Sequence, residues 1–319
     1  MNNQHMPTLQ DVLAARPNVY RYLQPTPLHH YATLSELVGT QVWIKHENHQ
    51  PVGAFKVRGG LNMAANLTPQ ERKAGLFTAS TGNHGQSIAF AARAYGINAT
   101  IAVPEGANPG KVAAMRGLGA TVVFHGADFD TAREWVMGVA AEEGGLFVGP
   151  TDEPLIHGVG TYALEIMESL PDVEVIIVPV GAGSGVCGTS IVAKTINPNI
   201  EVIGVQSEAA PAMQLSWQSG EMKTAVMNTF AEGIATRVPF ANTQRIMRHY
   251  LDDFVLVPDD AIRQAIVHLL HHTHNLAEGA GAAPLAAALQ LKARLAGKKV
   301  VLVMSGGNLS MEKLQTFLQ

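Results

Sequence analysis

Lys56 is the residue whose surroundings in the sequence most suggest chemistry. It follows Phe55 in the segment 51–60 and precedes the pair Gly59-Gly60 and a run that predicts a helix. A lysine amine that its surroundings keep neutral is a nucleophile and forms a Schiff base with a carbonyl group. By itself the segment is only a loop that enters a helix, so its meaning depends on which distant loops lie near it.

A first glycine-containing loop lies between a predicted strand and a predicted helix and consists of Ser80, Thr81, Gly82, Asn83 and His84. Free backbone N–H groups at the start of a helix bind anions such as carboxylate or phosphate. The hydroxyl groups of Ser80 and Thr81 and the amide of Asn83 add side-chain partners. Ordinary helix capping explains the same pattern, so this loop alone leaves both interpretations open.

A second loop follows the apolar run 175–180 and consists of small residues, Gly181, Ala182, Gly183, Ser184 and Gly185. Small residues let the backbone approach an anion closely at a helix N-terminus. The loop is not a dinucleotide fingerprint, because Val186 takes the place of the third glycine, and it lacks the Gly-Lys-Ser/Thr of a nucleoside triphosphate loop. A single phosphate monoester is the predicted ligand, with tight strand–helix packing as the alternative.

A third loop, Ser305-Gly-Gly-Asn308, follows the last predicted strand. As a lone motif it is equally consistent with a simple turn. In open α/β sheets, however, ligands bind outside the carboxyl ends of strands, where all three loops are expected. A lysine, a phosphate-binding loop, a carboxylate-binding loop and a small polar residue together predict a site for pyridoxal 5'-phosphate.

The order of elements predicts an α/β fold with two open parallel-sheet lobes. Strands and helices alternate at short spacing between residues 74 and 148, which predicts right-handed crossovers and a parallel sheet. The same alternation resumes after residue 149 and ends in a strand at 300–304, while 208–250 is expected to be irregular. We therefore predict one lobe from residues 74–148 and a second lobe from residues 1–73 and 149–319.

Composition limits the class of protein. The chain has 319 residues, 47% of them hydrophobic, and a net charge of −4 without a basic block, which argues against nucleic acid or an anionic membrane as partner. The single cysteine, Cys187, cannot form an internal disulfide and fits a reducing compartment. Residues 1–6 lack a targeting signal, and no apolar run approaches the roughly 18 residues of a membrane span. A cytoplasmic protein with a small-molecule substrate is expected.

The sequence resembles the threonine/serine dehydratases (ammonia-lyases) of the fold-type II pyridoxal phosphate enzymes, and is similar also to serine racemases and hydroxyectoine-utilisation dehydratases. The matching segments run in family order over almost the whole chain and are residues 45–60, 79–86, 179–185, 277–281 and 305–308. The resemblance implies a tryptophan synthase β-like fold, with the cofactor between a large cofactor-binding domain and a small, mobile substrate-binding domain. It also implies a homodimer or homotetramer.

The resemblance further implies a role for each matching residue. Lys56 would hold the cofactor as a Schiff base and act as the base at Cα, with Phe55 beside the ring and the neighbouring glycines making room for it. Ser305 would face the pyridine nitrogen, and Glu278 would lie in the same pocket. The phosphate would be bound by residues 181–185, the phenolic oxygen of the ring by Asn83, and the substrate carboxylate by Ser80, Thr81, Gly82 and His84.

The implied activity is β-elimination from a β-hydroxy amino acid, L-threonine or L-serine, giving a 2-oxo acid and ammonia. A larger substrate such as phenylserine or hydroxyaspartate stays open, and so does racemisation, because Thr81 takes the place of the serine that is the second base of serine racemases. Gln206 takes the place of a glutamate that binds metal in cation-activated relatives. No metal site is therefore predicted.

Overall fold

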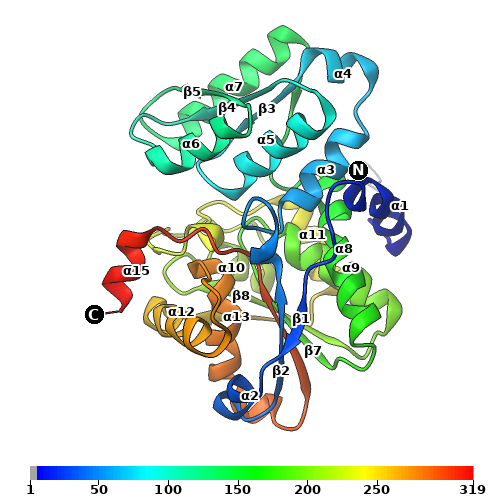
Figure 1. The fold of residues 1–319 in the computed structure, drawn as a ribbon, viewed down its shortest axis with the longest axis vertical. Helices are drawn as coiled ribbons and strands as arrows, with labels where there is room; N and C mark the ends of the chain where they lie inside the picture. Colours follow the sequence, from blue (N-terminus) through cyan, green and yellow to red (C-terminus); the bar gives the residue numbers. More distant parts are fainter. Residues whose placement is uncertain (1–5, 319) are drawn as a thin grey trace.

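The computed structural model describes residues 6–318, which fold into two lobes, each built on a parallel sheet (Figure 1). The predicted α/β fold with open parallel sheets is confirmed. Residues 1–5, in which no targeting signal is predicted, and residue 319 lie outside the described range. No helix within residues 6–318 is both long and apolar enough to cross a membrane.

The larger sheet has six strands in the order β1-β2-β10-β7-β8-β9. Its neighbouring strands are parallel except β1, which pairs antiparallel with β2. Every residue of β7 is buried, as expected for a strand with helices on both faces. The strand bounds, in sheet order, are Leu28–His30, Gln41–His46, Lys299–Met304, Val175–Pro179, Glu201–Ser207 and Asp253–Val257.

Alternate side chains of these strands pack into two separate cores, because successive residues of a strand point to opposite faces. One core includes Ile176 and Val178 and the helices α1 (Leu9–Tyr20), α8 (Glu153–Ser169), α9 (Ser184–Ile196), α10 (Ala212–Ser219) and α11 (Ala241–Tyr250). The other includes Ile177 and the helices α2 (Ala32–Val38), α12 (Asp259–Thr273), α13 (Gly279–Gln290), α14 (Lys292–Leu295) and α15 (Met311–Phe317).

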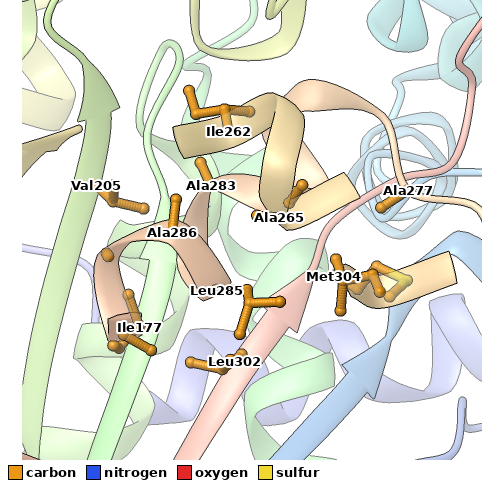
Figure 2. Packing of buried hydrophobic residues seen from close by; sticks show 14 of the residues in the cluster. Ile177, Val205, Ile262, Ala265, Ala277, Ala283, Leu285, Ala286, Leu302 and Met304 are labelled. Carbon is orange, nitrogen blue, oxygen red and sulfur yellow. The ribbon is translucent and has the colours of Figure 1, made fainter. Parts of the chain in front are cut away.

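Helix α13 lies directly on the sheet, between the strands and α12. Figure 2 shows Leu285 of α13 close to Leu302 of β10, and Ala283 of α13 close to Ile262 and Ala265 of α12. The N-terminus of α13 lies at the carboxyl end of β10, where the N–H of Glu278 donates to the carbonyl oxygen of Gly306 at 3.0 Å.

The smaller sheet, which with its helices we call the small lobe, has the order β5-β4-β3-β6, all parallel. Helix α7 covers one face, and α5 and α6 cover the other. The predicted domain boundaries at residues 74 and 148 stay a proposal, which this separate sheet supports. The strand bounds are Thr121–Phe124, Ala99–Val103, Leu76–Ala79 and Leu146–Phe147, and the helix bounds are Asn83–Tyr95 (α5), Pro109–Gly117 (α6) and Phe129–Glu143 (α7).

Helix α3 (Val57–Ala65), followed by α4 (Pro69–Ala74), connects the lobes and begins directly after Lys56. A Cβ atom on Gly59 would lie 2.7 Å from the carbonyl oxygen of Leu155, and one on Gly60 would lie 2.5 Å from Oγ of Ser87. Both glycines therefore make room for the neighbouring helices α8 and α5. The expectation that they also make room for a cofactor stays a prediction.

The expectation of irregular structure over 208–250 is also wrong, because this stretch contains α10 and α11. Helix α11 packs Ile246 and Met247 into the apolar core, and polar contacts also hold it in place. Gln244 is buried and donates from Nε2 to the carbonyl oxygen of Met213 at 2.8 Å, and Arg248 donates to that of Ser216 at 2.8 Å. Its few apolar residues are buried on one side, so the sequence carries an amphipathic signal for this helix that the expectation of irregular structure overlooked.

Four buried charged side chains join the start of α3 to the rest of the large lobe. The guanidinium group of Arg58 donates to both carboxylate oxygens of Glu47, at 2.7 and 2.8 Å, and to both of Glu165, at 2.7 and 3.0 Å. Lys45 on β2 also contacts Glu165, so two cations balance two carboxylates. Burial alone would raise the pKa of Glu47, but Arg58 outweighs it and lowers that pKa.

Replacing Arg58 with methionine should therefore destabilise the fold, because Glu47 and Glu165 would share Lys45 alone. Breaking a buried ion pair costs about 3–5 kcal/mol, and we expect the free energy of unfolding of Arg58→Met to fall by this amount in urea denaturation. The matched control is Arg16→Met, which breaks the exposed 2.6 Å pair with Glu168 and should cost less than about 1 kcal/mol. Equal effects of the two substitutions would contradict this role of Arg58.

Candidate active site

The loop before Lys56 is tied to the loop after β10, which brings the predicted Lys56 and Ser305 segments together. The backbone N–H of Phe55 donates to the carbonyl oxygen of Ser305 at 3.0 Å, and that of Gly307 donates to the carbonyl oxygen of Gly53 at 2.9 Å. Ala54 and Gly306 form an antiparallel bridge between them. Segments that are about 250 residues apart in the sequence thus form one surface.

The amine of Lys56 lies where its charge is poorly solvated. Burial lowers the pKa of Lys56 to about 8, against an opposing effect of the Glu278 carboxylate. Burial likewise raises the pKa of Glu278 to about 7. The ring centroid of Phe55 lies 5.3 Å from Nζ of Lys56. A part of the Lys56 population is therefore neutral near neutral pH, as a nucleophile or base requires.

The loop 181–185 follows β7 and leads into α9. At Gly181 and Gly183 of this loop there is no space for a side chain. A Cβ atom on Gly181 would lie 2.2 Å from the carbonyl oxygen of Gly233, and one on Gly183 would lie 2.8 Å from Cβ of Thr243. Gly183, the residue before α9, has φ +103°, which glycine adopts without strain. The loop thus presents its backbone N–H groups at a helix N-terminus, as an anion site requires.

Two buried hydroxyl groups hold this loop in place through hydrogen bonds to its carbonyl oxygens. No pattern in the sequence indicates this role for either residue. Thr243 of α11 donates from Oγ1 to the carbonyl oxygen of Ala182 at 2.6 Å, and Tyr162 of α8 donates to that of Gly185 at 2.9 Å. The rings of Tyr162 and Phe55 also meet edge to face, with centroids 6.1 Å apart. These residues hold loop carbonyls away from the face that an anion would approach.

The first predicted loop forms the N-terminus of α5, with Gly82 as the residue before the helix. The N–H of Gly82 donates to Oγ of Ser80 at 3.2 Å. The side chain of His84 is buried and donates from Nε2 to the carbonyl oxygen of Val148 at 3.1 Å. Burial lowers the pKa of His84 to about 4 and keeps it neutral. His84 would therefore bind a carboxylate through its backbone N–H and not through its side chain.

A chain of hydrogen bonds connects the lobes beside Lys56. Asn83 of α5 donates from Nδ2 to Oε1 of Glu278 at 2.8 Å, and Asn308 donates from Nδ2 to Oδ1 of Asn83 at 2.8 Å. The structure thus joins Asn83 and Glu278, while the bond from Asn83 to the phenolic oxygen of the cofactor stays a prediction. Asn308 belongs to the Ser305–Asn308 motif, but sequence reasoning gave it no role, and here it orients the amide of Asn83.

The residues present fit pyridoxal 5'-phosphate. The cofactor needs an amine, a phosphate cradle and a group for its pyridine nitrogen. Lys56, the Gly181–Gly185 loop and Ser305 offer these three features. Ser305 is 3% exposed, and within residues 6–318 no hydrogen bond reaches its hydroxyl group or the amine of Lys56. No group of three His, Cys, Asp or Glu residues in the same range is arranged to hold a metal ion.

Residues 19–306 match the model of the pyridoxal-phosphate dependent enzyme family, and the chain belongs to this family. The predicted family and cofactor are thereby confirmed.

Among known proteins, the chain is 41% identical to the L-threonine ammonia-lyase of Thermotoga maritima, over 98% of this chain and 78% of that one. Its structure is similar to that of a processed threonine deaminase isoform from Solanum lycopersicum, with a TM-score of 0.93 and 34% identity over 97% of this chain and 91% of that one. It is also similar to the serine racemase of Dictyostelium discoideum, with a TM-score of 0.91 and 32% identity over 96% and 100%.

The pKa of Lys56 predicts how the cofactor-free protein takes up pyridoxal 5'-phosphate. The amine must lose its proton to react, so the initial rate of uptake should rise with pH around a midpoint of about 8. Visible absorbance of the lysine-bound cofactor follows the reaction. In Glu278→Gln the midpoint should move to lower pH, because the carboxylate that stabilises the ammonium ion is gone. A midpoint near 10, as for an exposed lysine, would contradict this environment of Lys56.

Thr243 predicts a selective effect on the affinity for the cofactor. Thr243→Val preserves the shape of the side chain but removes the hydrogen bond to Ala182, at a cost of about 1–2 kcal/mol. The Kd of pyridoxal 5'-phosphate for the cofactor-free protein should rise by roughly ten-fold, measured by absorbance titration. The control is Thr316→Val on the exposed helix α15, which should leave the Kd unchanged. An unchanged Kd in Thr243→Val would show that the loop needs no such support.

Proposed function

We propose that this protein is a pyridoxal 5'-phosphate-dependent ammonia-lyase that eliminates water from L-threonine or L-serine and releases a 2-oxo acid and ammonia. The observation that carries the proposal is the juxtaposition of the Lys56 and Ser305 loops, in a chain 41% identical to an enzyme named L-threonine ammonia-lyase. The predicted reaction class is supported by that relative and by the similar threonine deaminase structure.

Lys56 is the proposed base. Bound pyridoxal 5'-phosphate supplies an electron sink for the electron pair that stays on Cα when its proton is removed. The neutral amine of Lys56 accepts this proton, and the lowered pKa makes the free base available near neutral pH. Phe55 shields the amine from water on one side. Proton removal at Cα then prepares the loss of the β-hydroxyl group.

The N-terminus of α5 orients the substrate carboxylate in this proposal. The backbone N–H groups that follow Gly82 have no partner within the first turn of a helix, and the α5 dipole favours an anion there. The hydroxyl of Thr81 is partly exposed beside them. Because Ser80 is held by the N–H of Gly82, it positions the turn as well as offering a donor.

Ser305 is the proposed partner of the pyridine nitrogen. A hydroxyl group is neutral over the whole physiological range and does not hold that nitrogen protonated, as a carboxylate would. Electron density is then withdrawn less strongly from Cα, which favours rapid loss of the β-hydroxyl group over return of a proton. This choice of residue supports elimination.

Racemisation of serine is the second candidate, since the similarity to a serine racemase of known structure is almost as high. A second proton donor on the opposite face of Cα would have to be Thr81. Its β-branched side chain is stiffer than serine, so it is less adaptable as a proton donor. A larger β-hydroxy amino acid such as phenylserine or hydroxyaspartate is an alternative substrate of the same elimination.

The cytoplasmic location is inferred from the composition, and the homodimeric or homotetrameric state from the family resemblance. Sedimentation equilibrium of the holoenzyme tests the assembly, and a monomer at micromolar concentration would contradict it.

An ammonia-release assay over β-hydroxy amino acids of differing size and charge tests the proposed function. We expect the highest kcat/KM with L-threonine or L-serine, with one 2-oxo acid formed per ammonia. Lys56→Ala should lower kcat by at least about 100-fold, since it removes the general base. Chiral analysis of the remaining substrate separates the alternatives. Formation of the D-enantiomer with little ammonia would overturn elimination in favour of racemisation.

A further inference from the structure

The segment 232–237 of the large lobe, which we call the bridging segment, reaches the small lobe through two ion pairs. Glu232 contacts Nζ of Lys111 on α6, and Nη2 of Arg237 lies 2.6 Å from Oδ2 of Asp130 on α7. In one pair the bridging segment supplies the carboxylate, and in the other it supplies the cation. The two pairs thus contact different helices of the small lobe, α6 and α7.

The bridging segment is mounted firmly on the large lobe. Gln206, fully buried on β8, donates from Nε2 to Oγ1 of Thr236 at 2.8 Å and to the carbonyl oxygen of Ile234 at 3.3 Å. Glu232 also accepts a hydrogen bond from Nζ of Lys313 on α15 at 2.7 Å. The segment is therefore firmly attached to the large lobe. The residues at its two ends, Glu232 and Arg237, form the ion pairs across the lobes.

The same segment lies against the candidate active site. The carbonyl oxygen of Gly233 occupies the space where a Cβ atom of Gly181 would be. The Cβ position of Gly233 is 3.4 Å from Oε1 of Glu278, which accepts from Asn83 of the small lobe. A shift of the small lobe relative to the bridging segment would thus also move Asn83 and the N-terminus of α5 relative to Lys56.

We propose that Glu232 and Arg237 are positioning residues, which hold the small lobe so that the carboxylate-binding loop 80–84 faces Lys56. In this role they set the KM for the amino acid and leave the chemical step at Lys56 unchanged. The inference rests on the proposed function for its substrate, but its structural part concerns the lobes alone. The Arg237–Asp130 pair is exposed, at 61% and 47% of the side chains, and the Lys111–Glu232 pair is partly exposed, at 25% and 54%, so salt weakens both.

Charge reversal at the Arg237–Asp130 pair tests the proposal. Loss of an exposed ion pair changes an equilibrium by up to about fivefold, and charge reversal adds repulsion, so Arg237→Glu or Asp130→Arg should raise the KM for L-threonine by about three- to tenfold, with kcat nearly unchanged. The double variant Arg237→Glu/Asp130→Arg should restore the KM to within about twofold of the wild type. In the wild type the KM should rise with NaCl concentration, and it should do so less in Glu232→Gln/Arg237→Gln.

The matched control is the exposed pair Arg16–Glu168, which lies within the large lobe. Arg16→Glu should leave the KM and its salt dependence unchanged. A KM that stays constant in both single reversals at Asp130 and Arg237, or a double variant that fails to recover, would overturn the proposal.

Hydrogen–deuterium exchange of the holoenzyme without substrate gives a readout that does not depend on the substrate. Amides of residues 80–86 and 109–117 should exchange faster in Arg237→Glu and return to wild-type rates in the double variant. If this pattern appears while no amino acid yields ammonia, the positioning role stands and the proposed reaction fails. Unchanged exchange in Arg237→Glu would contradict the positioning role whatever the substrate is.

Discussion

The burial of Arg58 is the constraint on which the rest of the structure depends. Its guanidinium group makes five hydrogen bonds, to Glu47, Glu165 and Thr161. All three of these residues are buried. An unpaired charge there would be strongly destabilising, so strand β2, helix α8 and the start of α3 must meet at one geometry. Because Lys56 directly precedes α3, the same requirement fixes the position of its amine.

Around this fixed point, the candidate site consists mainly of backbone. The loops at 53–55 and 305–307 bond to each other through main-chain groups, and the 181–185 loop fits only because its glycines lack side chains. Side chains such as Thr243 and Tyr162 act on carbonyl oxygens of that loop from outside the site. Such a site presents N–H groups to anions at little cost in reorganisation, while one lysine supplies the reactive group.

The sequence alone predicts the parts of this protein that depend on local pattern. The apolar run 175–180 and the glycines after it identify the central strand and its loop, and the separate motifs at Lys56 and Ser305 identify the cofactor. The role of Thr243 could not be predicted, because its hydrogen bond to Ala182 exists only when α11 packs against the 181–185 loop. The packing role of Gly59 and Gly60 could not be predicted for a related reason, since only the tertiary structure shows which atoms come close to a glycine.

Identification of the lysine that holds the cofactor tests the central claim most directly. Borohydride reduction of the holoenzyme converts the Schiff base to a stable secondary amine, and peptide mass spectrometry then locates the pyridoxyl group. The account predicts this group on Lys56 and on no other lysine of the chain, and predicts its loss in Lys56→Ala. A pyridoxyl group on a different lysine of the wild-type enzyme would contradict the account.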